Sequence, residues 1–260
     1  MAGLLFGGRY VNPDNSSKSG RTPLSWAAGN GHDGIVTLLL RQEHVNPDSS
    51  SESGRTPLFW AAEMGHEGIV KLLLGQENVN PDTPETKYGL TPLAWASANG
   101  HEGIVKLLLG QKEVDPDSST KSGRTPLLRA AEKGYEGIVK LLLERKDVNP
   151  NCSDIGHRTP LLLAAENGHE GIVKLLLERK DVHPNTTDKS YGRTPLSWAA
   201  GKGHEEIVKL LLGRQDVNPY TGDSRCGQTA LMLATNNRHD RVVALLQARL
   251  SRYFLVTSPR

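Results

Sequence analysis

The sequence predicts an all-α solenoid of about seven helix–turn–helix units with projecting loops, and two observations support this. The first is a Thr-Pro-Leu motif (Thr-Ala-Leu in its last copy) that returns every 34 or 35 residues. Its threonines are Thr22, Thr56, Thr91, Thr125, Thr159, Thr194 and Thr229. The second is that the same helix start and stop signals follow every threonine. A period of this size indicates supersecondary units that bury their apolar faces against their neighbours in a stack.

The second unit illustrates these signals. Thr56 can cap the free N–H groups of a helix, and Pro57 suits the first helical position. Gly65 can take the left-handed conformation that ends this first helix. Residues 66–74 then predict a second helix, with Glu67 near its positive end and a broad apolar face. A polar stretch rich in Pro, Ser, Asp and Gly follows, which indicates a loop. We call each loop of this kind, such as residues 46–54 before Thr56, a finger loop.

The repeats define the domain organisation. Seven units starting near residues 20, 54, 89, 123, 157, 192 and 227 fill residues 20–250 as one solenoid. Residues 1–19 align with the second half of a unit, so we expect a partial N-terminal repeat that begins inside a second helix, followed by a first loop. Residues 251–260 are expected to form a C-terminal tail. The Gly and Pro spacing predicts that no helix runs far beyond about 10 residues.

Composition narrows the class of protein. The chain has 260 residues and a net charge of +2, so we expect no nucleic acid or anionic membrane as partner. No apolar run approaches the roughly 18–20 residues of a membrane span, and the N-terminus does not resemble a signal peptide. Cys152 and Cys226 fall in loops two repeats apart, too far for a disulfide. These features predict an intracellular, cytoplasmic monomer with free thiols.

The repeated unit resembles the ankyrin repeat. The matching residues are Thr-Pro-Leu, then Ala-Ala, Gly-His, Ile-Val-Lys-Leu-Leu-Leu and Val-Asn, repeated over residues 20–250. Residues 20–28 and 192–200 share the sequence Gly-Arg-Thr-Pro-Leu-Ser-Trp-Ala-Ala. This sequence resembles ankyrin arrays in multidomain proteins of filamentous fungi, including NACHT-type signalling ATPases. The chain departs from the usual pattern in its longer loops and in lacking histidine after Thr-Pro-Leu. The missing histidine removes a hydrogen bond that commonly ties neighbouring ankyrin repeats.

Two columns of polar residues recur in the stack. The histidine after the helix-ending glycine is His32, His66, His101, His169, His204 or His239. Ladder neighbours lie roughly 10 Å apart and cannot converge on one metal ion, so these histidines are expected to satisfy backbone groups. The arginine before Thr-Pro is Arg21, Arg55, Arg124, Arg158 or Arg193. We expect either local ion pairs with Glu63, Glu132 or Glu166, or contact with a partner.

A third column holds all four tryptophans, Trp26, Trp60, Trp95 and Trp198, with Arg129 in the fourth unit. Neighbouring positions on the same helix face vary between units, while the Ala-Ala and Leu positions barely change. Variation within one chain marks positions where packing does not dictate the residue. The ankyrin resemblance places these positions on a concave face. Ordinary packing, or for Arg129 an ion pair with Glu132 or Glu166, is the alternative to partner contact.

No motif of a nucleotide-binding loop, nucleophile elbow or metalloprotease occurs, so we expect no enzyme activity, catalytic residue, cofactor or metal. The sequence favours a scaffold that binds another protein through its concave face and finger loops. The alternative is the sensor arm of a larger NACHT-type signalling ATPase whose catalytic part is absent from this chain. The predicted partner-binding residues are Arg55, Trp60, Met64, Trp95, Asn99, Arg124, Arg129, Lys133, Arg158, Arg193 and Trp198.

Overall fold

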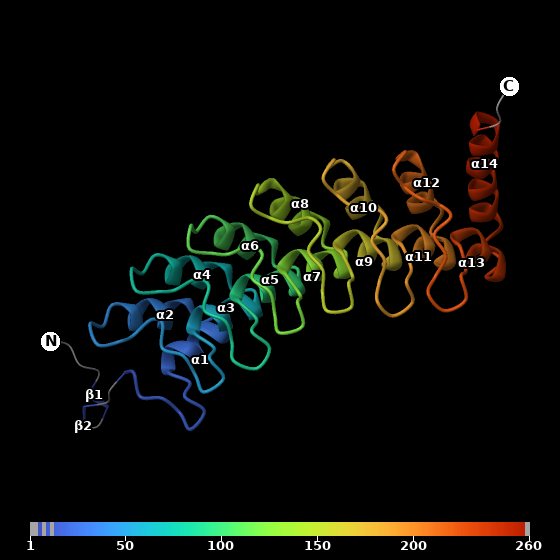
Figure 1. The fold of residues 1–260 in the computed structure, drawn as a ribbon. Helices are drawn as coiled ribbons and strands as arrows, with labels where there is room; N and C mark the ends of the chain where they lie inside the picture. The colour runs from blue at the N-terminus through green and yellow to red at the C-terminus, as the bar shows by residue number, and fades with distance from the viewer. Residues whose placement is uncertain (1–4, 7–8, 11–12, 258–260) are drawn as a thin grey trace. The chain divides into compact units, whose positions relative to one another are not determined.

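The structure, a computed structural model, describes residues 5–6, 9–10 and 13–257. Within these residues, fourteen α-helices form seven helix–turn–helix pairs, which confirms the predicted all-α repeat fold. The chain divides into two compact units, Met1–Lys121 and Ser122–Arg260, and each is described by itself. In both units the first helices of successive repeats pack in one row and the second helices in another (Figure 1).

The first unit contains three helix pairs. They are α1 (Pro23–Gly29) and α2 (Asp33–Leu40), α3 (Pro57–Met64) and α4 (Glu67–Leu74), and α5 (Pro92–Asn99) and α6 (Glu102–Leu109). The second unit contains four pairs. They are α7 (Pro126–Lys133) and α8 (Glu136–Glu144), α9 (Pro160–Asn167) and α10 (Glu170–Leu177), α11 (Pro195–Lys202) and α12 (Glu205–Gly213), and α13 (Ala230–Asn236) and α14 (Asp240–Thr257).

Each first helix begins at the threonine that the sequence predicts. In α3 the Thr56 hydroxyl accepts a hydrogen bond from the backbone N–H of Phe59, and Pro57 takes the first helical position. The helix ends at Gly65, whose φ of 83° is left-handed backbone that favours glycine. The core lies between the helix rows: Leu58 on α3 and Ile69 on α4 are fully buried. Some apolar side chains of the second helices stay exposed, such as Ile35 and Leu38 on α2.

The histidine column ties one repeat to the next. His101 at the start of α6 places Nε2 3.1 Å from the carbonyl oxygen of Glu63, near the end of α3. The same contact measures 3.0–3.2 Å at four further histidines, namely His66, His169, His204 and His239. The imidazole also covers the glycine that ends the preceding first helix, since a Cβ added to Gly65 would lie 2.8 Å from His101. The predicted backbone role of this column is confirmed, and it supplies the tie that the missing histidine after Thr-Pro-Leu does not.

Two expectations about the chain ends are wrong. The last helix, α14, runs for 18 residues, because no glycine or proline interrupts the sequence between Asp240 and Pro259. Near the other end, Leu5–Phe6 (β1) and Arg9–Tyr10 (β2) pair as short antiparallel strands where a second helix was expected. So short a segment cannot repay the cost of nucleating a helix. The remainder of residues 1–12 lies outside the described residues.

The two cysteines do not form a disulfide with each other, as predicted. Cys226 is exposed and Cys152 is half-buried. The Cys152 sulfur lies 3.1 Å from the hydroxyl oxygen of Thr125. Within the described part of the chain, no helix is both long enough and apolar enough to cross a membrane.

Replacing His101 by alanine tests the tie between repeats. The change removes a hydrogen bond and uncovers Gly65, so we expect the free energy of unfolding to fall by about 1–2 kcal/mol in urea titrations. His183→Ala is the matched control, because that side chain is exposed and only its backbone contacts the neighbouring loop. Equal stability of the two variants would contradict the role given to the histidine column.

Candidate functional site

Arginine and tryptophan side chains alternate along the first unit. The guanidinium carbon of Arg21 lies 3.7 Å from the ring centre of Trp26 and 3.9 Å from that of Trp60. One repeat on, Arg55 lies 4.8 Å from the ring centre of Trp60 and 5.9 Å from that of Trp95. A cation over an aromatic face at these distances is attracted by the ring. We call these five residues the arginine–tryptophan ladder.

Packing fixes the ladder in the middle and leaves one end open. Phe59 contacts Trp60 and Trp95 edge-on, at centroid distances of 6.5 and 6.4 Å, and is itself fully buried. Trp60 and Trp95 are half-buried, and their indole N–H groups have no hydrogen-bond partner. Trp26, by contrast, is 48% exposed. The ladder therefore ends in a largely exposed indole at Trp26, whose ring Arg21 contacts.

Two arginines pair with the glutamate eight residues on. Arg55 lies 3.1 Å from a carboxylate oxygen of Glu63, and Arg124 hydrogen-bonds Glu132 in the second unit. Burial raises the pKa of Glu63, and the positive charges of Arg55 and then Arg21 oppose that rise. Local ion pairing, one of the two alternatives for this column, is thus confirmed at these positions.

In the second unit, two arginines share one buried carboxylate. Asp154 is 3% exposed at its side chain and lies 2.8 Å from Arg158 and 3.5 Å from Arg124. Its other oxygen accepts backbone hydrogen bonds from Gly156 and Arg158, at 2.9 and 3.0 Å. Burial favours the neutral acid, but the hydrogen bonds and charge of Arg158 outweigh it and hold the pKa of Asp154 below its ordinary value. Arg158 therefore pairs with Asp154. The local ion pair that was expected as one alternative, with Glu166, does not form.

Arg193 and Trp198 repeat the arginine–aromatic contact later in the second unit. The guanidinium of Arg193 lies 5.0 Å from the ring centres of both Trp198 and Tyr191, and it also pairs with Asp223 at 3.3 Å. The indole N–H of Trp198 donates to Asp188 at 2.9 Å. Trp198 is therefore held in place by its own repeat.

Arg129 lacks the ion pairs that Arg55, Arg124, Arg158 and Arg193 form. It forms no ion pair with Glu132 or Glu166 in the second unit, and its Nε is buried without a hydrogen-bond partner. Burial lowers its pKa, and the nearby charge of Arg124 lowers it further. The ion pair expected as the alternative for Arg129 is therefore wrong, because Arg124 already occupies Glu132.

Comparison with known families identifies the repeated unit. The model for ankyrin repeats, in three copies, matches residues 2–85, 77–154 and 146–223. The chain belongs to the ankyrin repeat family. A search of curated proteins found no match. Ankyrin repeats generally mediate protein–protein interactions, and their fold is typically a non-catalytic scaffold.

Three further predicted residues lie near the ends of the first helices of these ankyrin repeats. Met64 is 52% exposed, and Lys133 is also exposed. Asn99 is exposed and donates to the carbonyl of Glu63 at 3.3 Å, so its amide links two repeats. These three exposed residues occupy positions that vary between the ankyrin repeats, while the Ala-Ala and Leu positions are buried in most repeats.

A cavity of about 400 Å³ in the second unit brings together Arg124, Arg158 and Trp198. The cavity is also lined by residues that were not predicted from the sequence, among them Asp154, Ile155, Asp188 and Tyr191. They belong to the loops, whose contacts have no period in a single sequence; only the recurring Asp before Arg-Thr-Pro could have drawn attention to Asp188. Within the described residues, no three side chains of metal-binding type come together.

Asp154 offers a test of this charge arrangement. Replacing it by alanine leaves Arg124 and Arg158 without their shared carboxylate, and we expect a loss of about 1–3 kcal/mol of unfolding free energy. Because the pKa of Asp154 is depressed in the folded state, this stabilisation is present above its ordinary pKa and is lost as the pH falls below it.

The matched control is Asp147→Ala, since Asp147 also pairs with an arginine but is 54% exposed. An exposed pair of this kind contributes only about 0–1 kcal/mol. Urea titrations of both variants at neutral pH measure the difference, and equal losses would contradict the shared role of Asp154.

Proposed function

We propose that this ankyrin repeat protein is a scaffold that binds another protein through the first helices and finger loops, the face that the family resemblance makes concave. The observation that carries the proposal is Arg129, which is half-buried beside positions that vary between repeats and whose buried Nε has no hydrogen-bond partner. An arginine held without a carboxylate is ready to accept one from a partner. Tryptophan and arginine are also the residue types that dominate interface energies.

The arginine–tryptophan ladder supports the same surface in the first unit. Arg21 and Arg55 stack on the indole rings and restrain them. Little side-chain freedom would therefore be lost when a partner binds. The exposed Trp26 and Met64 add apolar area beside these cations. A partner segment with acidic and apolar side chains fits this combination. We propose a monomer acting in the cytoplasm, without a cofactor and without catalysis.

Binding measurements on variants test the proposal. After a partner is captured with the intact chain, Arg129→Ala and Trp95→Ala should each weaken binding by about 1–3 kcal/mol in calorimetric titrations. Lys71→Ala, Lys106→Ala and Lys140→Ala are the controls, because these exposed lysines lie on the second helices α4, α6 and α8. If the lysine variants abolish binding while the other two bind normally, the working surface is the row of second helices.

A second candidate is the sensor arm of a NACHT-type signalling ATPase. The wording of residues 20–28 and 192–200, which resembles fungal arrays of such proteins, supports it. Reading the native gene upstream of Met1 distinguishes the candidates. A Walker motif there favours the sensor arm, and an open reading frame that starts at Met1 favours the free scaffold.

A further inference from the structure

One loop position recurs along the chain, and at several repeats its side chain contacts the next loop. It follows the proline after Val-Asn or its equivalent, and it lies just past the second helix of each repeat. Its residues along the chain are Asp14, Asp48, Asp82, Asp117, Asn151, Asn185 and Tyr220. The column therefore changes from carboxylate to amide in the middle of the chain.

The amides in the second unit make two hydrogen bonds each. Asn151 accepts from the backbone N–H of His183 at 2.8 Å and donates through Nδ2 to the carbonyl of Asp181 at 2.7 Å. Asn185 does the same with Asn218 and Asp216, at 2.8 and 2.6 Å. One donor and one acceptor on the side chain thus match one acceptor and one donor on the neighbouring loop.

The carboxylates in the first unit complete only half of this pattern. Asp82 accepts from the backbone N–H of Asp115 through Oδ2, at 3.3 Å. Its Oδ1 takes the place of the amide nitrogen of Asn151, so the equivalent acceptor is the backbone carbonyl of Glu113. An ionised carboxylate has no hydrogen to donate there. In agreement, Oδ1 of Asp82 is buried and has no hydrogen-bond partner.

Asp48 repeats this arrangement one loop earlier. Its carboxylate accepts from the backbone N–H of Asn80, and its Oδ1 is likewise buried without a partner. By the same equivalence, the carbonyl that faces Oδ1 belongs to Asn78. The one titratable side chain in residues 76–80 of that facing loop is Glu77, which carries the same charge sign as Asp48.

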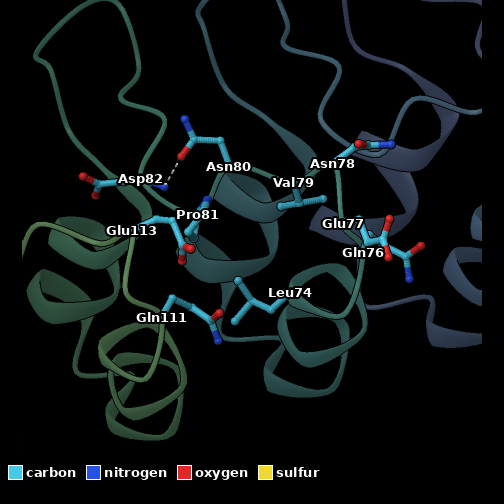
Figure 2. A pocket seen from close by; sticks show the side chains of 10 residues that line it. All are labelled: Leu74, Gln76, Glu77, Asn78, Val79, Asn80, Pro81, Asp82, Gln111 and Glu113. Carbon is cyan, nitrogen blue, oxygen red and sulfur yellow. Dashed lines mark hydrogen bonds between the residues drawn. The ribbon is translucent and has the colours of Figure 1, made fainter.

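The surroundings of Asp82 favour its neutral form. It lines a cavity of about 750 Å³, where Figure 2 shows Asn80, Asp82 and Glu113 on one side. None of the residues that line this cavity is basic, and two besides Asp82, namely Glu77 and Glu113, are acidic. Of the charged residues on the facing loop, Lys112 is exposed outside the cavity lining, and Asp115 adds a negative charge. Burial first, and then Asp115, raises the pKa of Asp82 to about 6.

We propose that Asp82 and Asp48 are proton-binding ties between the finger loops of the first unit. A proton taken from water binds Oδ1, and the resulting O–H donates to the backbone carbonyl of the next loop, as the Asn151 amide does in the second unit. The first-unit loops are then held together more tightly in mildly acidic solution than at neutral pH, where only the hydrogen bond that each carboxylate accepts remains. The second-unit loops, tied by amides, do not respond at these positions.

The direction of the pH effect follows from proton linkage. The pKa of Asp82 is about 6 in the folded chain and ordinarily 3.8, so the folded state binds the proton more tightly. The resulting stabilisation is complete below the ordinary pKa and is lost as the pH rises through about 6. Burial raises the pKa of Asp48 in the same direction.

Exchanging the two residue types tests the proposal. Asp82→Asn supplies the missing donor at every pH, so it should raise the melting temperature by about 2–4 °C at pH 7.5. At pH 5.0 the wild-type carboxyl is protonated, and the gap should shrink to less than half. Asn151→Asp should do the reverse: it should lower the melting temperature at pH 7.5 and recover most of the loss at pH 5.0.

Glu113→Gln is the matched control, because it removes a negative charge from the same cavity without supplying the tie. Under the proposal it does not reproduce the effect of Asp82→Asn. A gap between Asp82→Asn and wild type that is absent, or equal at both pH values, would overturn the proposal. An effect of Glu113→Gln as large as that of Asp82→Asn would also overturn it. A carbon-13 NMR titration of the Asp82 carboxyl is the direct readout, with a midpoint near 6 expected and one near 4 contradicting the tie.

Discussion

Within each unit, the stack depends on a hydrogen bond between the histidine that opens a second helix and a carbonyl at the end of the first helix of the repeat before; only α8 opens with another residue, Tyr135. The histidine ring lies over a glycine in left-handed backbone, so one contact serves two purposes. It pairs a carbonyl that the helix end would otherwise leave unsatisfied, and it holds two repeats in register. A side chain on the glycine would collide with the ring, so a histidine in one repeat requires a glycine at the end of the first helix in the repeat before it. Within each unit, repeats are thus linked by contacts between neighbours.

Because these internal positions carry the packing, other positions are free to vary. The tryptophan column shows the consequence: it holds an exposed indole at Trp26, half-buried ones at Trp60 and Trp95, and a guanidinium at Arg129. The arginines before Thr-Pro either stack on these rings or pair with carboxylates of their own unit. The surface of the first helices is therefore a mixture of aromatic area and positive charge on a rigid frame, which suits recognition of another protein.

The fold could be predicted almost entirely from the sequence, because caps, glycines and apolar stripes recur with every repeat. Thr56, Gly65 and Ile69 take the roles that their residue types indicate. The candidate site could be predicted only in part. Arg55 and Glu63 lie on one helix and its cap, so their pairing follows from local spacing. The pairing of Asp154 with Arg124 and Arg158 does not follow from local spacing.

Loop contacts of that kind need the positions of two neighbouring loops. In the fifth repeat, His157 has a φ of 59° at the position where the other repeats have glycine, a left-handed backbone that its residue type does not predict. The length of α14 was missed for the opposite reason. The predicted limit of about 10 residues assumed that glycine or proline ends each helix, and α14 contains neither residue.

We propose that the first helices and finger loops bind a protein partner. Amide hydrogen exchange of the chain, alone and with a captured partner, tests this most directly. Binding should slow exchange in the finger loops and in first helices such as α3, α5, α7 and α9, and should leave the second helices α4, α6, α8 and α10 unchanged. Protection confined to the second helices, with the first helices and finger loops unaffected, would contradict it.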